Sequence, residues 1–304
     1  MAHVKQRYMK LKGLPVHSFK SVGRQIGLDV RVVDGQLQVS RLLPRSLWAQ
    51  RLSSKSSFCR AVVQSGILTR RQMVHAALRY RLGRSKDDAV IYWQIDQMGQ
   101  VHDGKLMWYG SDCHRLKDRK ASWIMFLLKQ HYGIPVDAFQ STHCFFGTHL
   151  LSNKGQESYP KKGRSFHSKN IPHEERARTF LEERGLSSYL GTVALVEAEK
   201  SAVILSELYP QCIWLATGGM DEVQTEKFMP LCDYKVILFP DTDTEGRAFT
   251  RWYDAAQKVM KSFFWPKDNP IRVSPFLERH ATPDQKRRKI DLVDYIVESP
   301  IAGA

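Results

Sequence analysis

The spacing of apolar residues changes near residue 190. Beyond that point, short and nearly continuous apolar runs alternate with segments of helical spacing; the runs are GTVALVE, CIWLATGG, YKVILFPD and PIRVSPF. Strands without polar alternation are buried on both faces, and strands that alternate with helices form mainly parallel sheets. The pattern therefore predicts an α/β domain over residues 188–304, with a mainly parallel sheet and helices on both faces.

Upstream of this domain the pattern predicts a smaller α+β region. Residues 46–84 carry apolar residues at helical spacing, with Gly66 and Gly83 as stop signals. Residues 89–110 are expected to form two strands with a turn near Gly99.

Three further segments complete the expected organisation. KASWIMFLLKQHYG has helical spacing, and we expect that helix to end at Gly133. Residues 152–172 are polar and rich in Gly, Ser and Pro, which predicts a loop or linker. The start of the chain is basic and contains a predicted hairpin around Asp34-Gly35. The predicted regions are a basic segment at 1–45, a basic α+β subdomain at 46–187 and the α/β domain at 188–304.

The charge of the chain favours a polyanionic partner. Forty-six Lys and Arg residues stand against 31 Asp and Glu, for a formal charge of +15. Nucleic acid is the commonest polyanion that basic proteins bind. No apolar run approaches the ~20 residues of a membrane span, and the first residues lack the apolar core of a signal peptide. We expect a cytoplasmic protein without membrane contact.

Three carboxylates follow predicted strands of the second domain. Glu197 ends GTVALVE, and Asp241 and Asp243 end VILFPDTD. Ligands of such sheets bind beyond the carboxyl ends of the strands, and side chains two residues apart in an extended segment point to the same side. Converging carboxylates need a neutralising cation, and Mg²⁺ prefers oxygen ligands. The pattern predicts a Mg²⁺ site, with Mn²⁺ as a substitute; the alternative is that one of the aspartates caps the following helix.

Other families with two aspartates at this spacing fit less well. An EF-hand loop starting at Asp241 would need Glu at its twelfth position, where the chain has Trp252. Phosphatases of the haloacid dehalogenase type carry their motif near the chain start. A glycosyltransferase remains open, although it explains neither Glu197 nor the basic charge.

The order and spacing of TVALVEAEKSAVI, IWLATGG and VILFPDTDTEG resemble the Toprim domain of bacterial primases, topoisomerases and some nucleases. The resemblance implies that Glu197, Asp241 and Asp243 form the Mg²⁺ site. KIDLVDYIVE is similar to the D-x-x-D-Y ending of primase-like Toprim proteins. Residues 89–109 and HCFFGTHLL are similar to the basic subdomain of bacterial DNA primase catalytic cores and of primase-like proteins from mobile elements of Bacteroides-type bacteria.

Two departures from the primase pattern limit what the resemblance implies. No cysteine pattern supplies the zinc-binding domain that helps bacterial primases select a template. The first acidic residue of primases is usually followed by glycine, where this chain has Ala198.

The resemblance implies an enzyme, a DNA primase-like nucleotidyltransferase that uses Mg²⁺ to make short primers on single-stranded DNA. Asp241 and Asp243 are then expected to hold the metal, with Glu197 as a further ligand or catalytic base. Nucleoside triphosphates are the expected substrates, and a replicative or element-encoded helicase is a candidate partner. A Toprim-type metal-dependent nuclease and a non-catalytic nucleic-acid-binding accessory protein are the alternatives. The candidate nucleic-acid-binding residues are basic side chains expected to contact phosphates: Arg79, Arg81, Arg84, Lys86, Lys105 and Lys200.

Overall fold

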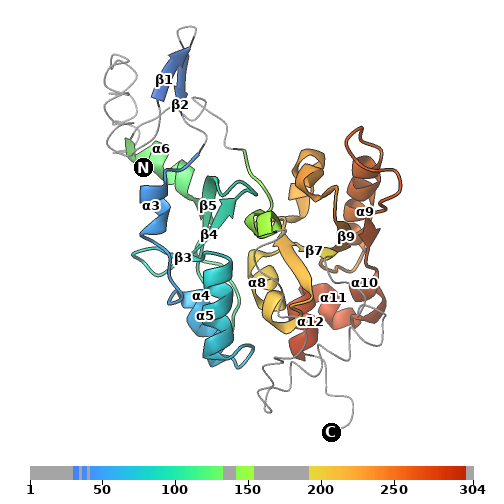
Figure 1. Ribbon diagram of the computed structural model, residues 1–304. Coiled ribbons are helices and arrows are strands. Elements are labelled where there is room, and N and C mark those ends of the chain that lie inside the picture. Colours follow the sequence, from blue (N-terminus) through green and yellow to red (C-terminus); the bar gives the residue numbers. More distant parts are fainter. Residues whose placement is uncertain (1–29, 34–35, 40–41, 133–141, 154–191, 299–304) are drawn as a thin grey trace. The chain divides into compact units, whose positions relative to one another are not determined.

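A computed structural model describes residues 30–33, 36–39, 42–132, 142–153 and 192–298 of the 304-residue chain (Figure 1). The chain divides into two compact units. The first contains residues 1–65 and 77–144, and the second contains residues 66–76 and 145–304. The predicted domain boundary at residue 188 lies outside the described residues. None of the helices in the described ranges combines the length and apolar character of a membrane span.

An antiparallel sheet forms the centre of the first unit. Its order is β3 (Gly83–Arg84), β4 (Val90–Ile95), β5 (Val101–Met107) and β6 (Ser122–Trp123). The predicted turn between β4 and β5 is confirmed, and Gly99 there adopts a φ of +79°, which favours glycine. The predicted early hairpin is also present as β1 (Val30–Val33) and β2 (Gln36–Val39).

The helices of this part of the chain are shorter than the sequence predicts. They are α3 (Arg45–Ala49), α4 (Ser57–Gln64), α5 (Arg70–Arg79) and α6 (Ile124–Tyr132). Gly66 follows α4 with a φ of +73°, as a helix stop signal should. The expected start of the last helix was wrong, because Ser122 and Trp123 pair with β5 before α6 begins.

Trp93 on β4 explains why Gly83 is not a helix stop signal. Trp93 is fully buried, and a Cβ atom on Gly83 or Gly104 would lie 2.6 Å from its ring. Both glycines occupy strands beside β4, where the missing side chain leaves room for the indole. Gly83 is therefore a packing residue of the sheet.

The second unit contains the predicted parallel sheet. Its order is β10 (Arg272–Val273), β9 (Lys235–Phe239), β7 (Thr192–Val196) and β8 (Cys212–Ala216), and all neighbours are parallel. The helices are α8 (Glu199–Leu208), α9 (Arg247–Met260), α10 (Phe276–His280), α11 (Pro283–Arg288) and α12 (Leu292–Glu298). Between β8 and β9 the chain forms two 3-10 helices, η4 (Met220–Glu222) and η5 (Thr225–Leu231).

Alternate residues of the strands bury both faces of this sheet. Val193, Leu195 and their neighbours on β8 and β9 pack against Trp252 of α9 and Phe228 of η5. On the opposite face, Trp214 contacts Tyr209, which ends α8. Every residue of β7 is buried, as the apolar run predicts.

The strand order places a topological switch point between β7 and β9. The chain passes from β7 to β8 on one side and then returns to β9 on the other side of β7. Open α/β sheets bind ligands at such a point, outside the carboxyl ends of the two central strands. In this unit those ends are Val196 and Phe239.

Candidate functional site

Glu197 and Asp241 lie directly at this switch point. Glu197 follows the last residue of β7, and Asp241 lies two residues beyond the end of β9. The Glu197 carbonyl accepts a hydrogen bond of 2.9 Å from the Gly218 backbone N–H after β8. Because β7 and β9 pair in register, the two carboxylates leave the sheet at neighbouring positions.

The segment before α12 joins the loop after β9. The Thr242 N–H donates to the Ile290 carbonyl at 3.2 Å, and its hydroxyl donates to Glu278 Oε1 at 2.8 Å. The bond to Ile290 brings the next residue, Asp291, toward Asp241. Asp291 and Asp294 were not predicted as site residues, although both belong to the D-x-x-D-Y motif.

The electrostatic environment of Asp241 disfavours its ionised form. Burial raises the pKa of Asp241 well above its usual value, and the charges of Glu197 and Asp291 raise it further. Asp294 adds to this effect, and Lys200 opposes it. Asp241 therefore lies among carboxylates that repel its negative charge, and a bound cation would relieve that repulsion.

Lys200 is the internal counter-ion of this group. Its Nζ lies 3.2 Å from Asp291 Oδ2 and 3.2 Å from Asp294 Oδ1. Against the opposing effect of burial, the charge of Lys200 and a 2.6 Å hydrogen bond from Ser201 Oγ lower the pKa of Asp291. Burial and then the charge of Asp291 raise the pKa of Asp294. The phosphate contact predicted for Lys200 stays a prediction, and its side chain is engaged with carboxylates in this structure.

The D-x-x-D pair also begins α12. The Asp294 N–H donates to Asp291 Oδ1 at 2.8 Å, and the Asp291 N–H donates to Asp294 Oδ2 at 3.3 Å. This reciprocal arrangement satisfies two N–H groups at the helix start, as a capping box does. The same two side chains thus fix a helix and hold Lys200.

Asp243 organises the start of α9. Its Oδ1 accepts from the backbone N–H groups of Glu245 at 2.9 Å and Arg247 at 3.2 Å, and its Oδ2 accepts from Ala248 at 2.9 Å. Although desolvation opposes it, this backbone hydrogen bonding lowers the pKa of Asp243. The helix-capping alternative describes these contacts, while a metal contact by the remaining lone pairs of Asp243 stays a prediction.

The donor set at the switch point suits a hard cation held by few protein ligands. Within the described ranges, no three His, Cys, Asp or Glu side chains form a group that could hold a metal ion by themselves. Mg²⁺ is commonly held by one or two carboxylates together with water and substrate phosphates. Glu197 and Asp241 match that smaller set.

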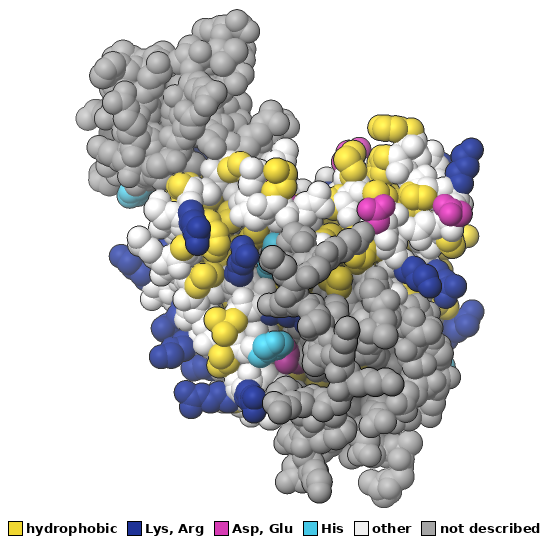
Figure 2. Space-filling model, in the orientation of Figure 1, with side chains coloured by type: hydrophobic (Ala, Val, Ile, Leu, Met, Phe, Trp, Pro, Cys, Tyr) yellow, Lys and Arg dark blue, Asp and Glu magenta, His cyan; other side chains and the backbone are white. Residues whose placement is uncertain are grey.

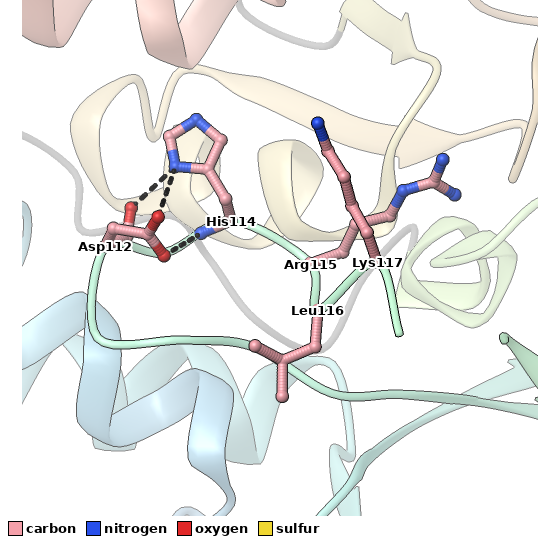
Figure 3. A pocket seen from close by; sticks show the side chains of 5 residues that line it. All are labelled: Asp112, His114, Arg115, Leu116 and Lys117. Atoms are coloured by element: carbon pink, nitrogen blue, oxygen red, sulfur yellow. Dashed lines mark hydrogen bonds and ion pairs between the residues drawn. The ribbon is translucent and has the colours of Figure 1, made fainter. Parts of the chain in front are cut away.

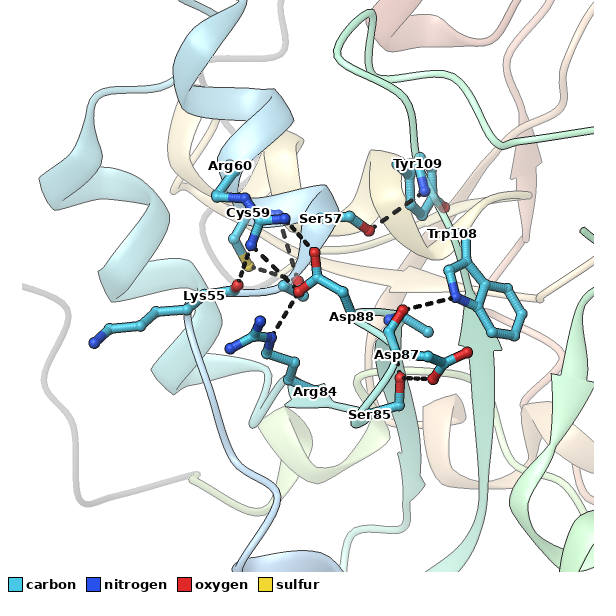
Figure 4. A network of polar contacts seen from close by, with 12 residues as sticks. Lys55, Ser57, Cys59, Arg60, Arg84, Ser85, Asp87, Asp88, Trp108 and Tyr109 are labelled. Atoms are coloured by element: carbon cyan, nitrogen blue, oxygen red, sulfur yellow. Dashed lines mark hydrogen bonds and ion pairs between the residues drawn. The ribbon is translucent and has the colours of Figure 1, made fainter.

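The predicted nucleic-acid-binding residues of the first unit differ in their contacts within the protein. Arg84 Nε lies 2.6 Å from Asp88 Oδ1, and Arg60 pairs with the same carboxylate (Figure 4). The hydrogen bonds from Arg60 and Arg84 lower the pKa of Asp88, although burial opposes this effect. The Arg81 guanidinium lies 5.9 Å from the centre of the Trp48 ring. Arg84 and Arg81 therefore have structural contacts of their own.

The other predicted cations are distributed over several elements. Arg79 ends α5, Lys86 lies exposed in the turn before β4, and Lys105 is on β5. Lys200 belongs to the second unit. Of the tryptophans on and after the same strands, Trp93 is buried, whereas Trp108 is partly exposed with Arg119 5.4 Å from its ring centre.

A basic pocket in the loop after β5 was not predicted. It has a volume of about 450 Å³ and is lined by Asp112, His114, Arg115, Leu116 and Lys117 (Figure 3). His114 is bonded to Asp112, whereas Arg115 and Lys117 have no ion-pair partner among the described residues. The dense basic run HRLKDRK is the sequence signal that marks this loop.

The family comparison covers both units. The model of the family described as Domain of unknown function (DUF6371) matches residues 56–163 and 159–242, which together make up more than half of the chain. A search of curated proteins finds no match.

Proposed function

The chain belongs to the DUF6371 family, and we propose that it is a primase-like, Mg²⁺-dependent nucleotidyltransferase with a Toprim-like catalytic domain that acts on single-stranded DNA. The observation that carries the proposal is the position of Glu197 and Asp241 at the switch point of the parallel sheet. A basic first unit with partly unpaired cations supports a polyanionic substrate.

Each side chain of the site has a separate task in this proposal. Asp241 and Glu197 would hold Mg²⁺, which when bound would neutralise negative charge on a nucleoside triphosphate. Glu197 Oε is also the group that we expect to accept the proton of an attacking 3′-hydroxyl. The hydroxyl oxygen bonds to the α-phosphorus, and the bond from that phosphorus to pyrophosphate breaks.

Two further residues hold the site in place, while the metal contact of Asp243 and the phosphate contact of Lys200 remain predictions. Asp243 fixes the start of α9, so the backbone beside Asp241 keeps its conformation. Lys200 compensates Asp291 and Asp294, which limits the negative charge that surrounds Asp241.

The test is incorporation of labelled nucleotides on mixed-sequence single-stranded DNA with Mg²⁺ or Mn²⁺. We expect short products with the wild-type protein and a loss of about 100-fold or more for Asp241→Asn, the size of effect typical when a group that stabilises transition-state charge is removed. Glu197→Gln should give a comparable loss. The matched control is Asp268→Asn, which removes the charge of an exposed aspartate in the loop between α9 and β10 and should retain activity.

The same gel separates the alternatives. Template cleavage that disappears with Asp241→Asn would replace the primase by a nuclease with the same carboxylates. Products of equal yield from Asp241→Asn and wild type would contradict the proposed site. DNA binding without any synthesis or cleavage would favour the accessory protein.

A further inference from the structure

Thr242, the residue between the two aspartates that follow β9, is anchored at two atoms. It is only 1% exposed, its backbone N–H donates to the Ile290 carbonyl at 3.2 Å, and its hydroxyl donates to Glu278 Oε1 at 2.8 Å. Because one bond starts from the backbone and the other from the side chain, Thr242 cannot rotate without losing one of them. The peptide groups on its two sides carry Asp241 and Asp243. The directions of both carboxylates therefore depend on how Thr242 is held.

Glu278, which accepts the Thr242 hydroxyl, is itself held in place. It belongs to α10, where Phe276 and Leu277 are buried. Lys286 Nζ lies 3.2 Å from Glu278 Oε2 and donates to the Glu278 carbonyl at 2.8 Å. One oxygen of the carboxylate thus faces Thr242 and the other faces Lys286, so Glu278 has a defined orientation.

Lys286 in turn belongs to the well-fixed first turn of α11. The Thr282 N–H donates to Gln285 Oε1 at 3.0 Å, and the Gln285 N–H donates to Thr282 Oγ1 at 3.2 Å. These reciprocal bonds form a capping box at the start of the helix. A continuous chain of contacts therefore leads from α11 through Glu278 to the loop after β9.

The Glu278 carboxylate also lies beside Gly246, the residue directly before α9. A Cβ atom on Gly246 would lie 3.7 Å from Glu278 Oε2. The Gly246 N–H donates to the Asp243 carbonyl at 3.4 Å and closes the turn that leads into α9. Glu278 is thus close to both ends of the segment that contains Asp243, and its hydrogen bond with Thr242 holds the end nearer Asp241.

We propose that Glu278 is a positioning residue of the metal site, which holds Thr242 and thereby keeps Asp241 in the direction in which it binds a cation together with Glu197. Replacing a residue that holds metal ligands in place typically weakens metal binding about 10- to 100-fold. The inference rests on the proposed function for the identity of the metal ion. Its test needs neither DNA nor catalysis, so the two can fail separately.

The experiment titrates Mn²⁺ into the full chain without DNA or nucleotide and measures the free ion by electron paramagnetic resonance. The binding component of interest is the one that Asp241→Asn removes. Thr242→Val keeps the shape of the side chain without its hydroxyl, and it should weaken this component about ten-fold or more. Thr242→Ser keeps the hydroxyl and should stay within about two-fold of wild type.

Glu278→Ala removes the same hydrogen bond from its other end and should cause a similar loss. The double variant with Thr242→Val should bind Mn²⁺ about as well as either single variant, because one shared contact can be lost only once. Thermal melts without metal check that each variant unfolds cooperatively. If Thr242→Val does not, Glu278→Ala and Thr242→Ser carry the comparison.

Ser206→Ala provides the matched control. Ser206 is a buried residue of α8 whose hydroxyl donates to the Val203 carbonyl at 2.8 Å, and its loss should not change Mn²⁺ binding. An unchanged affinity of Thr242→Val or Glu278→Ala would overturn the inference. An equal loss for Thr242→Ser would also overturn it, because the hydroxyl would then not be the group that matters.

Two outcomes separate this inference from the proposed function. A wild-type protein without a Mn²⁺ component that depends on Asp241 would overturn both, because no metal site would then exist there. The expected series of affinities in a protein that incorporates no nucleotides would contradict the proposed function and support the role of Glu278.

Discussion

The two units of this chain use charge in different ways. Over the described residues, the first unit has 15 Lys and Arg against 6 Asp and Glu, whereas the second has 16 against 17. Figure 2 shows Lys and Arg side chains at several separate places on the face in view. In the first unit cations outnumber anions more than two to one, whereas in the second the two nearly balance and the arrangement of individual charges matters.

The two charge distributions suit different tasks: net charge attracts a polyanion from a distance, whereas fixed carboxylates act on a bound ligand. A net positive surface attracts a polyanion whatever the exact position of each cation. A carboxylate group beside a parallel sheet acts only if its members are fixed, as Lys200 fixes Asp291 and Asp294. Substitutions in the second unit should therefore have larger and more specific effects than substitutions in the first.

The largest effect on stability should come from Lys200→Met. Asp291 is 4% exposed, and removing its counter-ion leaves a buried charge whose remaining partners are neutral donors. Losing one member of a buried pair costs about 3 kcal/mol or more. Urea denaturation should show this loss in the free energy of unfolding, and Lys200→Met with Asp291→Asn should recover part of it.

Lys261→Ala is the matched control. It removes a cation directly after α9 that has no ion-pair partner among the described residues. Its free energy of unfolding should stay within about 0.5 kcal/mol of wild type. An equally small change for Lys200→Met would show that Asp291 is not held as a buried ion.

Removing cations from the first unit should change the affinity for single-stranded DNA rather than the free energy of unfolding. Replacing Lys86, Arg115 and Lys117 by alanine removes three cations without ion-pair partners among the described residues. Each phosphate contact to a single strand contributes about 0.7 to the slope of log affinity against log salt, so the slope should fall by about 2. Anisotropy titrations of single-stranded DNA over a range of salt concentrations measure it.

Removing the same charge from the second unit tests whether the location of the cations affects DNA binding. Alanine at Lys235, Lys267 and Arg279, three exposed cations, removes the same formal charge. We expect a smaller change in slope for this variant. Equal slopes for both triple variants would show that only the net charge of the chain determines binding, and the contrast between the units would disappear.

Local patterns predicted the parts of the fold that depend on neighbouring residues. The apolar runs and the residues after them indicated β7 and β9, and with them the positions of Glu197 and Asp241. The parallel sheet was confirmed because fully buried strands have a distinctive composition. For Asp243 the sequence allowed two predictions, because a carboxylate before a helix can cap that helix or bind a metal ion.

Contacts between distant residues could not be predicted from local pattern. Lys200 and Asp294 are 94 residues apart, and only the folded chain brings them together. The local pattern predicts Gly83 as a helix stop signal, whereas its actual role depends on Trp93 on the adjacent strand. The pocket at Arg115 and Lys117 likewise depends on how the loop after β5 folds back.

The smallest expected effect is a gain in stability from Asp241→Asn, the substitution that should lower nucleotide incorporation about 100-fold or more. Burial and the surrounding carboxylates raise the pKa of Asp241 in the folded state above its value in the unfolded chain. Such a group favours folding below its unfolded pKa, and this contribution is lost as the pH rises through the folded pKa. Near neutral pH and without divalent cations, Asp241→Asn should therefore raise the melting temperature.

The gain should shrink toward about pH 4, where the carboxyl of Asp241 is protonated in the wild-type protein as well. Thermal melts in EDTA at both pH values measure it, and Asp268→Asn, with its exposed side chain, should show no such difference. Added Mg²⁺ should stabilise the wild type and leave Asp241→Asn unchanged, because a ligand that binds only the folded form raises its melting temperature. A lower melting temperature of Asp241→Asn at both pH values would mean that Asp241 stabilises the second unit. The second unit would then not contain a site where carboxylates repel one another, and the contrast with the basic first unit would not hold.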